Sequence, residues 1–300
     1  MSKLEISFGK MRWKNPITVA SGTFGLEYAE LFDFSLLGAI TTKTITPEPK
    51  KGNKPQRIVE TEAGMLNSIG LQNPGLEVFI KTDLQEYRKF DTNLIVSISA
   101  STMDEFVEII EKLDTQPGID AYEINVSCPN VENEGIAFGT DEEMVFELIR
   151  NIISVTERTV VVKLTPNVTS IENIALAAQK AGADGLALIN TLYGMAIDID
   201  LKKPKLHNVI GGYSGPGIKP IALQNVYRVA KIVDIPILAM GGISSTEDAL
   251  EFVITGATAI AVGTHNFVDP LSTLEIINGL EIYCENNSVQ YHDLIGSIRV

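Results

Sequence analysis

The sequence predicts an α/β protein: a (β/α)8 TIM barrel with an N-terminal β-hairpin and inserted loops at the C-terminal face. Eight short, apolar and β-branched runs recur along the 300 residues, and helical patterns separate several of them. Near-continuous apolar strands that alternate with helices are typical of a parallel sheet covered on both faces. Eight such units in a chain of this length favour a closed barrel over an open sheet.

Each element follows from local residue patterns. The expected strands cover residues 17–22, 39–44, 94–99, 122–128, 160–165, 185–191, 236–242 and 259–264. Apolar residues at helical spacing predict helices over residues 101–113, 141–155, 170–183 and 245–257. The stretch "LEISFGKMRWKNP", residues 4–16, precedes the first strand and is expected to form a hairpin that caps the bottom of the barrel.

Three connections are longer than a plain turn between strand and helix: residues 45–72, 129–140 and 192–217. In a (β/α)8 barrel the loops that follow the strands form the catalytic face, so this extra length predicts a covered site. Since no low-complexity segment or internal break interrupts the chain, residues 1–300 are expected to form a single domain.

Composition excludes several classes of function. The net charge of −14 argues against a nucleic-acid partner, which requires a basic face. No span approaches about 18 apolar residues, and the N-terminus lacks the apolar core of a signal peptide, so we expect no membrane association and a cytoplasmic location. The two cysteines and three scattered histidines suggest a reducing compartment and no metal site.

Polar residues at the ends of the expected strands predict the ligand. Lys43 and Lys163 end apolar strands, where a lysine is costly to bury unless it meets an opposite charge. Glycines after the last two strands allow backbone N–H groups to approach an anion. A phosphorylated cofactor or substrate is therefore expected, although rim lysines and tight glycine turns are the alternative reading.

Several amide side chains lie in a loop over residues 64–75 or near the strand ends: Asn67 and Gln72 in that loop, and Asn125, Asn130 and Asn190 in the stretches "NVSCPN" and "INT". An amide offers both a donor and an acceptor, so a group of them in one pocket suits a planar ring with amides and carbonyls. Asparagine also occurs in ordinary turns, and a single one would prove nothing.

Cys128 stands where an expected strand gives way to a loop, directly before Pro129. The chain offers no four-ligand metal set, and a disulfide with Cys284 is not expected. No histidine neighbours it in sequence to suggest a Cys–His pair for acyl transfer. Two readings stay open: an inert buried thiol, or a general base that acts at mildly alkaline pH.

At this point the chain resembles the dihydroorotate dehydrogenases, specifically the catalytic subunits of class 1B. The motifs that carry the resemblance span nearly the whole chain: "GMLNSIGLQNPG", "EINVSCPNVENEGIAFG", "INTLYGMAIDI", "GGYSGPGIKPIALQNVYRV", "AMGGISS" and "AVGT". The resemblance implies a (β/α)8 barrel that carries FMN and oxidises (S)-dihydroorotate to orotate in pyrimidine biosynthesis.

The resemblance also implies residue roles. Cys128 would remove the C5 proton of dihydroorotate while C6 delivers hydride to flavin N5, under a closing loop 129–140. The substrate would be held by Lys43, Asn67, Ser68, Ile69, Gly70, Leu71, Asn125, Asn130, Asn190 and Thr191. The cofactor would be held by Ser21, Lys43, Thr44, Ser97, Asn125, Lys163, Ile189, Gly215, Gly241, Gly242, Gly263 and Thr264. Within that set Lys163 would favour negative charge on the reduced flavin. Ser97 departs from the family pattern, in which an asparagine is expected.

In class 1B the electrons leave through a separate subunit that carries FAD and a [2Fe-2S] cluster and reduces NAD⁺. This chain has neither a GxGxxG motif in a strand–turn–helix context nor a cysteine set for a cluster, so such a partner is expected, with a homodimer core in a heterotetramer. The alternatives are a class 1A, fumarate-linked enzyme and a dihydropyrimidine dehydrogenase-like enzyme. The residues alone also allow a Schiff-base aldolase or lyase that uses one of the two lysines, or a non-catalytic binding module.

Overall fold

The computed structural model describes residues 3–126 and 138–299. Eight parallel strands form the barrel wall: β3 (Ile17–Val19), β4 (Ala39–Thr41), β7 (Asn93–Ile98), β8 (Ala121–Asn125), β9 (Thr159–Lys163), β10 (Gly185–Leu188), β15 (Ile237–Ala239) and β16 (Ala259–Val262). They are ordered β3-β16-β15-β10-β9-β8-β7-β4, and β4 lies against β3, which nearly closes the barrel. The eight predicted strands are confirmed, and each ends before its predicted carboxyl end. The polar residues assigned to the strand ends therefore lie mostly in the loops that follow.

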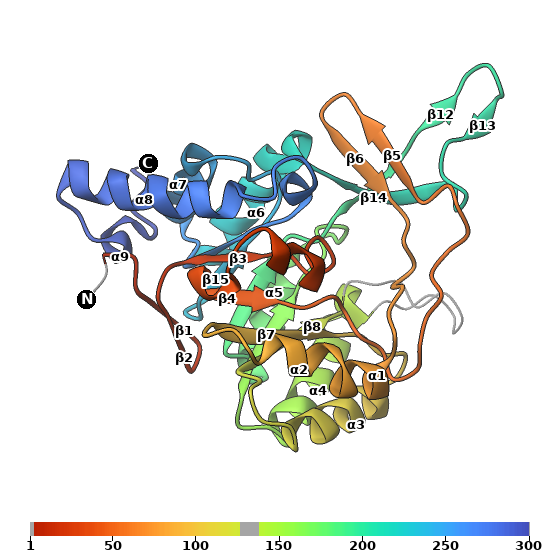
Figure 1. Ribbon diagram of the computed structural model, residues 1–300, viewed down its shortest axis with the longest axis horizontal. Helices are drawn as coiled ribbons and strands as arrows, with labels where there is room; N and C mark the ends of the chain where they lie inside the picture. Colours follow the sequence, from red (N-terminus) through yellow and green to blue (C-terminus); the bar gives the residue numbers. More distant parts are fainter. Residues whose placement is uncertain (1–2, 127–137, 300) are drawn as a thin grey trace.

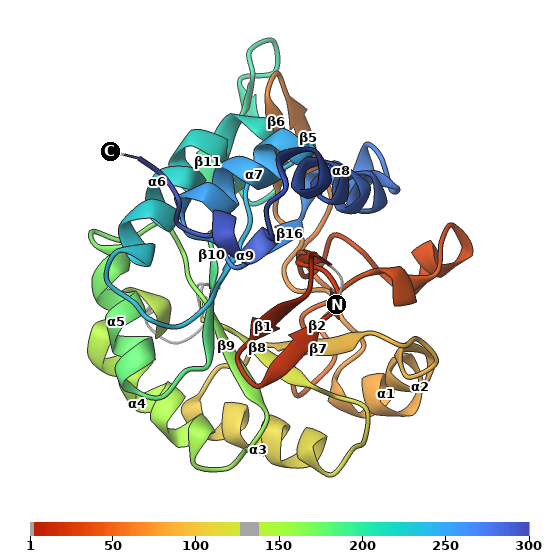
Figure 2. The same ribbon diagram turned by 90° about the vertical axis from the view of Figure 1, so that its left-hand side faces the viewer.

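Helices surround the barrel (Figure 2). They are α1 (Leu76–Lys81), α2 (Asp83–Tyr87), α3 (Met103–Asp114), α4 (Glu142–Ile153), α5 (Ile171–Lys180), α6 (Lys219–Ala230), α7 (Thr246–Thr255), α8 (Ser272–Asn287) and α9 (Tyr291–Leu294). The four predicted helices are α3, α4, α5 and α7. Each begins after a side-chain N-cap that satisfies a free backbone N–H: Thr102, Asp141, Ser170 and Ser245. Between β3 and β4 two 3₁₀ helices, η1 (Leu26–Glu30) and η2 (Phe34–Leu36), take the place of an α-helix.

The predicted N-terminal hairpin is confirmed as β1 (Ile6–Phe8) and β2 (Met11–Trp13), which lie across the amino-terminal end of the barrel (Figure 2). Phe8 and Trp13 are fully buried, and their rings stack with centroids 5.1 Å apart. A Cβ atom on Gly185, the first residue of β10, would lie 2.8 Å from the Phe8 ring. The hairpin therefore packs directly on the strand ends and closes this end of the barrel with apolar side chains.

Two of the three long connections contain strands of their own, which the sequence did not predict. Residues 45–72 and 192–217 contribute a four-stranded antiparallel sheet, ordered β11 (Leu192–Met195), β14 (Ile210–Ser214), β6 (Gly64–Asn67) and β5 (Ile58–Thr61). A two-stranded ribbon, β12 (Ile197–Asp198) with β13 (Lys203–Pro204), extends beyond it (Figure 1). The strands are short and partly exposed, and β6 pairs with β14, which is distant in sequence. No local residue pattern therefore predicted them. Of the third connection, only residues 138–140 are described, as the 3₁₀ helix η3 (Phe138–Thr140).

Within the described residues, no helix is long and apolar enough to cross a membrane. The same part of the chain holds no cluster of three or more side chains suited to bind a metal ion.

Candidate active site

A cavity of about 860 Å³ lies at the carboxyl-terminal end of the barrel, between the strand ends and the four-stranded sheet. Of the predicted substrate residues that are described, all line it: Lys43, Asn67, Ser68, Ile69, Gly70, Leu71, Asn125, Asn190 and Thr191. Of the predicted cofactor residues, Ser21, Thr44, Lys163, Ile189, Gly215, Gly241, Gly242, Gly263 and Thr264 line it as well. Residues from every part of the chain thus meet in one place.

Four of the predicted residues are not among the described residues of the cavity wall. Ser97 is fully buried in β7 and does not line the cavity. Cys128 and Asn130 lie outside the described residues. Gln72, which the amide pattern also suggested, does not line the cavity and instead accepts a hydrogen bond from Arg57 (2.6 Å).

Lys163 forms part of the cavity floor. The lysine is 4% exposed, and its Nζ donates to Ser21 Oγ (2.9 Å) and lies 3.4 Å from Glu123 Oε1. Glu123 Oε1 also accepts a hydrogen bond from Ser97 Oγ (2.8 Å), and Ser97 Oγ is 2.9 Å from Thr44 Oγ1. The expected buried lysine is therefore paired with a buried carboxylate that sequence reasoning missed. The signal was a glutamate within the otherwise apolar run "AYEIN".

Glycines shape the opposite wall. Gly215, Gly241 and Gly242 have φ values of +98°, +127° and +78°. A Cβ on Gly242 would lie 2.8 Å from Lys219 Cβ and 3.0 Å from Gly215 O, and a Cβ on Gly215 would lie 2.7 Å from Gly64 Cα. Both the backbone conformation and the close approach require glycine at these positions. The turn therefore presents backbone rather than side chain to the cavity.

An ion pair supports this turn from behind. Lys219, the first residue of α6, contacts Asp248 Oδ1 (2.6 Å), and Asp248 Oδ2 accepts from Ser244 N (2.9 Å) and Ser244 Oγ (2.8 Å). Burial raises the pKa of Asp248, but the hydrogen bonds from Lys219 and Ser244 outweigh it, so the pKa lies below its ordinary value. The Asp248 carboxylate thus ties α6 to the loop after β15.

The lip formed by residues 68–71 is held by hydrogen bonds to a neighbouring loop. Asn53 Nδ2 donates to Ser68 Oγ (3.0 Å), and Asn53 N donates to Ile69 O (2.9 Å). Gly70 has a φ of +75°, and a Cβ there would lie 2.7 Å from the Asn53 side chain. Asn53 is another cavity residue that the sequence did not single out.

The amide side chains of Asn67, Asn167 and Asn190 are held by hydrogen bonds to neighbouring backbone groups. Asn167 Nδ2 donates to Thr191 O (2.9 Å), Thr191 N donates to Asn190 Oδ1 (2.7 Å), and Asn67 Nδ2 lies 3.4 Å from Gly212 O. The sequence suggested that Asn67 lies in a loop, but it ends strand β6 and is therefore placed by the antiparallel sheet. The sheet thus contributes polar groups to the barrel's cavity.

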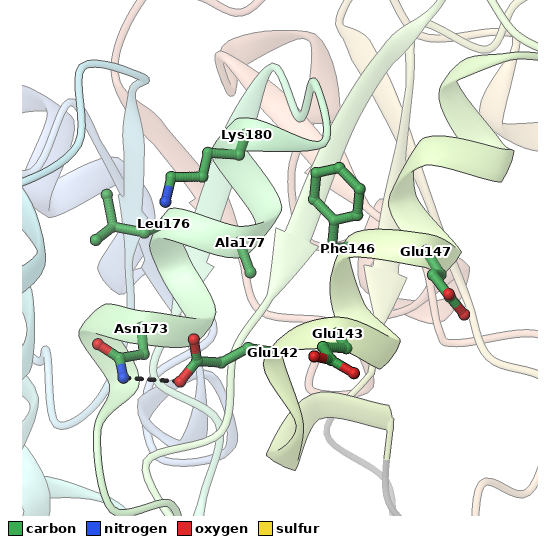
Figure 3. Close-up of a pocket in the computed structure, with 8 residues that line it drawn as sticks. All are labelled: Glu142, Glu143, Phe146, Glu147, Asn173, Leu176, Ala177 and Lys180. Atoms are coloured by element: carbon green, nitrogen blue, oxygen red, sulfur yellow. Dashed lines mark hydrogen bonds between the residues drawn. The ribbon is translucent and has the colours of Figure 1, made fainter.

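A second hollow, of about 360 Å³, lies between helices α4 and α5 on the outside of the barrel (Figure 3). Its wall includes Glu142, Glu143 and Glu147, and Glu142 Oε1 accepts a hydrogen bond from Asn173 (2.7 Å). It contains none of the predicted site residues, so the candidate chemistry lies at the barrel mouth.

Fold and site together define a class: a (β/α)8 barrel with a buried lysine, a glycine-shaped turn and an amide group around one cavity at its carboxyl-terminal face. The sequence model of the family described as "Dihydroorotate dehydrogenase" matches residues 3–283. The chain belongs to the dihydroorotate dehydrogenase family, and the predicted family is confirmed.

Curated relatives are similar over almost their full length. A protein of Thermoanaerobacter pseudethanolicus named "Dihydroorotate dehydrogenase B (NAD(+)), catalytic subunit" is 50% identical over 300 residues, 99% of each chain. Proteins with the same name from Alkaliphilus metalliredigens and Caldicellulosiruptor saccharolyticus are 49% and 46% identical. These alignments cover 96% and 99% of this chain, and 95% and 99% of the relatives.

Proposed function

We propose that this chain oxidises dihydroorotate to orotate in pyrimidine biosynthesis, as a single FMN-binding domain and the catalytic subunit of an NAD⁺-linked enzyme. The observation that carries the proposal is that residues from all the family motifs line one cavity, apart from those of "SCPN" that are not described. Full-length similarity to relatives named as such catalytic subunits supports it.

The cavity suits a phosphorylated flavin. Gly215, Gly241 and Gly242 line the cavity without side chains, and a Cβ atom at any of the three would collide with neighbouring protein atoms. Their backbone can therefore approach a phosphate group directly. We assign the phosphate to this turn, with Gly263 and Thr264, and the ring to Ser21, Thr44, Asn125, Lys163 and Ile189. When bound, FMN supplies the hydride acceptor. Ser97 would act on the ring only through its neighbours, since it does not line the cavity.

The substrate would lie above the ring. Dihydroorotate carries a carboxylate and a ring of amides and carbonyls, so it calls for one cation and several amide partners. We assign the cation to Lys43 and the amide partners to Asn67, Asn125, Asn130 and Asn190, with Thr191. The lip of residues 68–71 would add backbone groups, and its hydrogen bonds to Asn53 hold them in position.

We propose Cys128 as the general base that removes the C5 proton of the substrate. The residue follows Asn125, which lines the cavity, by three positions in the chain. A thiol with an ordinary pKa of about 8.5 would act increasingly as a base as the pH rises towards that value. The loop 129–140 would close over it and exclude water.

The onward path of electrons requires a partner. We propose a second subunit with FAD and a [2Fe-2S] cluster that reduces NAD⁺, in a heterotetramer built on a homodimer of this chain. The small number of cysteines fits a reducing compartment, and we place the reaction in the cytoplasm.

An anaerobic titration tests the proposal. The purified chain should show a flavin spectrum that dihydroorotate bleaches and dihydrouracil, which lacks the carboxylate, does not. Absence of flavin, or equal bleaching by both compounds, would contradict it. NADH should form only when the iron–sulfur partner is added; formation at full rate by the chain alone, or a preference for fumarate, would contradict the proposed acceptor.

A further inference from the structure

We propose that Glu123 is a positioning residue: its carboxylate holds the Lys163 ammonium under the cavity and sets the net charge that the cofactor ring meets. The inference rests on the proposed function, in which that ring lies against Lys163. It assigns a role to a residue that does not itself line the cavity.

Glu123 lies directly beneath the cavity floor, where it contacts Lys163, a residue that lines the cavity. It lies in the middle of β8 and is 1% exposed. Its Oε1 contacts Lys163 Nζ (3.4 Å) and accepts from Ser97 Oγ (2.8 Å). Lys163 in turn hydrogen-bonds to Ser21, and Ser97 hydrogen-bonds to Thr44. Ser21 and Thr44 both line the cavity. Two chains of polar contacts thus join the buried carboxylate to the cavity floor.

This arrangement is costly for the fold. Glu123 Oε2 is buried without a hydrogen-bond partner among the described residues. A buried carboxylate with one oxygen unsatisfied destabilises a protein, and an apolar side chain of similar size would avoid that cost. The flanking residues Tyr122 and Ile124 are buried and fit the apolar wall. A charge retained at such a cost, beside the candidate active site, is better explained by function than by stability.

The charges point to what that function is. Glu123 and Lys163 are the charged residues that are fully buried in the described part of the chain. As a pair they are close to neutral, and at this separation in a low-dielectric interior each strongly affects the other. Without the carboxylate, the Lys163 cation would favour negative charge above it more strongly. Glu123 therefore moderates the attraction of this floor for a negatively charged ring.

The position of Ser97 agrees with this role. A longer asparagine was expected there as a direct ligand, whereas the serine directs its hydroxyl to Glu123. A hydrogen bond to one carboxylate oxygen stabilises the charged form and fixes its orientation. Ser97 thereby acts on the cavity through Glu123 and not by direct contact.

The test is the midpoint potential of bound FMN in the full-length chain, measured by spectroelectrochemistry. Glu123→Gln keeps the shape and removes the charge, so the potential should shift to more positive values. A tenfold change in the reduction equilibrium corresponds to about 30 mV for a two-electron couple, and we expect at least that. The affinity for oxidised FMN, measured by titration of the apoprotein, should change less than the affinity for reduced FMN.

Glu172→Gln is the matched control. Glu172 lies on α5, pairs with Arg228 and does not line the cavity, so the same chemical change there should leave the potential unaltered. An equal shift in both variants would overturn the inference, as would a folded, FMN-loaded Glu123→Gln protein with the wild-type potential.

Ser97→Ala keeps the test decisive if Glu123→Gln does not fold. It removes the donor but leaves the carboxylate, whose negative charge then acts on Lys163 with less compensation, so the potential should shift in the opposite direction and by less. An unchanged potential in Ser97→Ala would then overturn the inference. A wild-type chain without FMN would overturn the proposed function itself, whereas FMN-loaded protein with unshifted variants overturns only the role of Glu123.

Discussion

At its amino-terminal end the barrel is closed by the hairpin β1–β2, whose Phe8 and Trp13 side chains are fully buried and stacked. At its carboxyl-terminal end the barrel opens into a cavity whose wall holds lysines, amides and glycines with positive φ. The first end buries apolar surface at little cost, and the second keeps polar groups and strained turns that cost stability. The comparison indicates that one end stabilises the fold and the other carries out the chemistry, a division known from barrels of this type.

Substitution of the two cysteines should separate these two roles most strongly. Cys128→Ser, at the proposed active end, should slow flavin reduction by dihydroorotate about 10²- to 10⁴-fold at neutral pH, because a hydroxyl is a much weaker base. Rapid-mixing absorbance of the bound flavin measures this rate, and FMN content should stay unchanged.

The matched control is Cys284→Ser. Cys284 is buried in α8, and burial raises the pKa of its thiol. This variant should lose stability and keep the reduction rate per bound flavin. An unchanged rate in Cys128→Ser would mean that Cys128 has only a packing role.

Removal of a buried side chain from the hairpin should have the opposite effect: a loss of stability with little change in turnover. Trp13→Ala removes a fully buried indole and should lower the free energy of unfolding by about 3–5 kcal/mol. Denaturant unfolding measures this loss, while turnover per bound FMN should stay close to wild type. Arg12→Ala, on the exposed face of the same strand, is the control and should change stability little. A large fall in turnover without loss of stability would break the comparison between the two ends.

A methyl group in the glycine turn should weaken cofactor binding. Gly242→Ala combines a φ of +78° with a Cβ 2.8 Å from Lys219 Cβ, so the turn must shift. Strain of this kind costs about 1–3 kcal/mol, which corresponds to roughly a 5- to 150-fold weaker FMN affinity in a titration of the apoprotein.

Gly296→Ala provides the control for backbone strain alone. Its φ is +68°, but a Cβ there would meet nothing within 4 Å. It should lower stability slightly and leave FMN affinity unchanged. Equal FMN affinities in the two variants would show that the glycine turn does not bind FMN.

The two ends also differ in how far sequence could predict them. The barrel strands, the hairpin and the placement of Lys163 follow from local patterns, because a strand and its last residues share a short stretch of chain. The antiparallel sheet that brings Asn67 to the cavity depends on pairing of Met65 with Ser214, which no local pattern encodes. The same limit explains Ser97, which was expected to face the cofactor. Its partner Glu123 lies on the neighbouring strand, and only the barrel register brings the two together.

The ion pair behind the glycine turn gives the smallest effect and a dependence on pH. The pKa of Asp248 lies below its ordinary value in the folded state, so its pairing stabilises the fold above the unfolded pKa of about 3.9 and is lost as pH falls through the folded pKa. Asp248→Asn should therefore lower the free energy of unfolding by about 1 kcal/mol near neutral pH, since one partly buried carboxylate loses its charge-assisted contacts. As the pH falls through the folded pKa, the difference between wild type and variant should shrink, because the wild-type carboxylate then becomes protonated as well. Denaturant unfolding of both proteins at a series of pH values measures this, and a difference that grows as pH falls would contradict the role of the pair. FMN affinity should fall only slightly, because the Lys219–Asp248 pair supports the turn from behind and does not line the cavity.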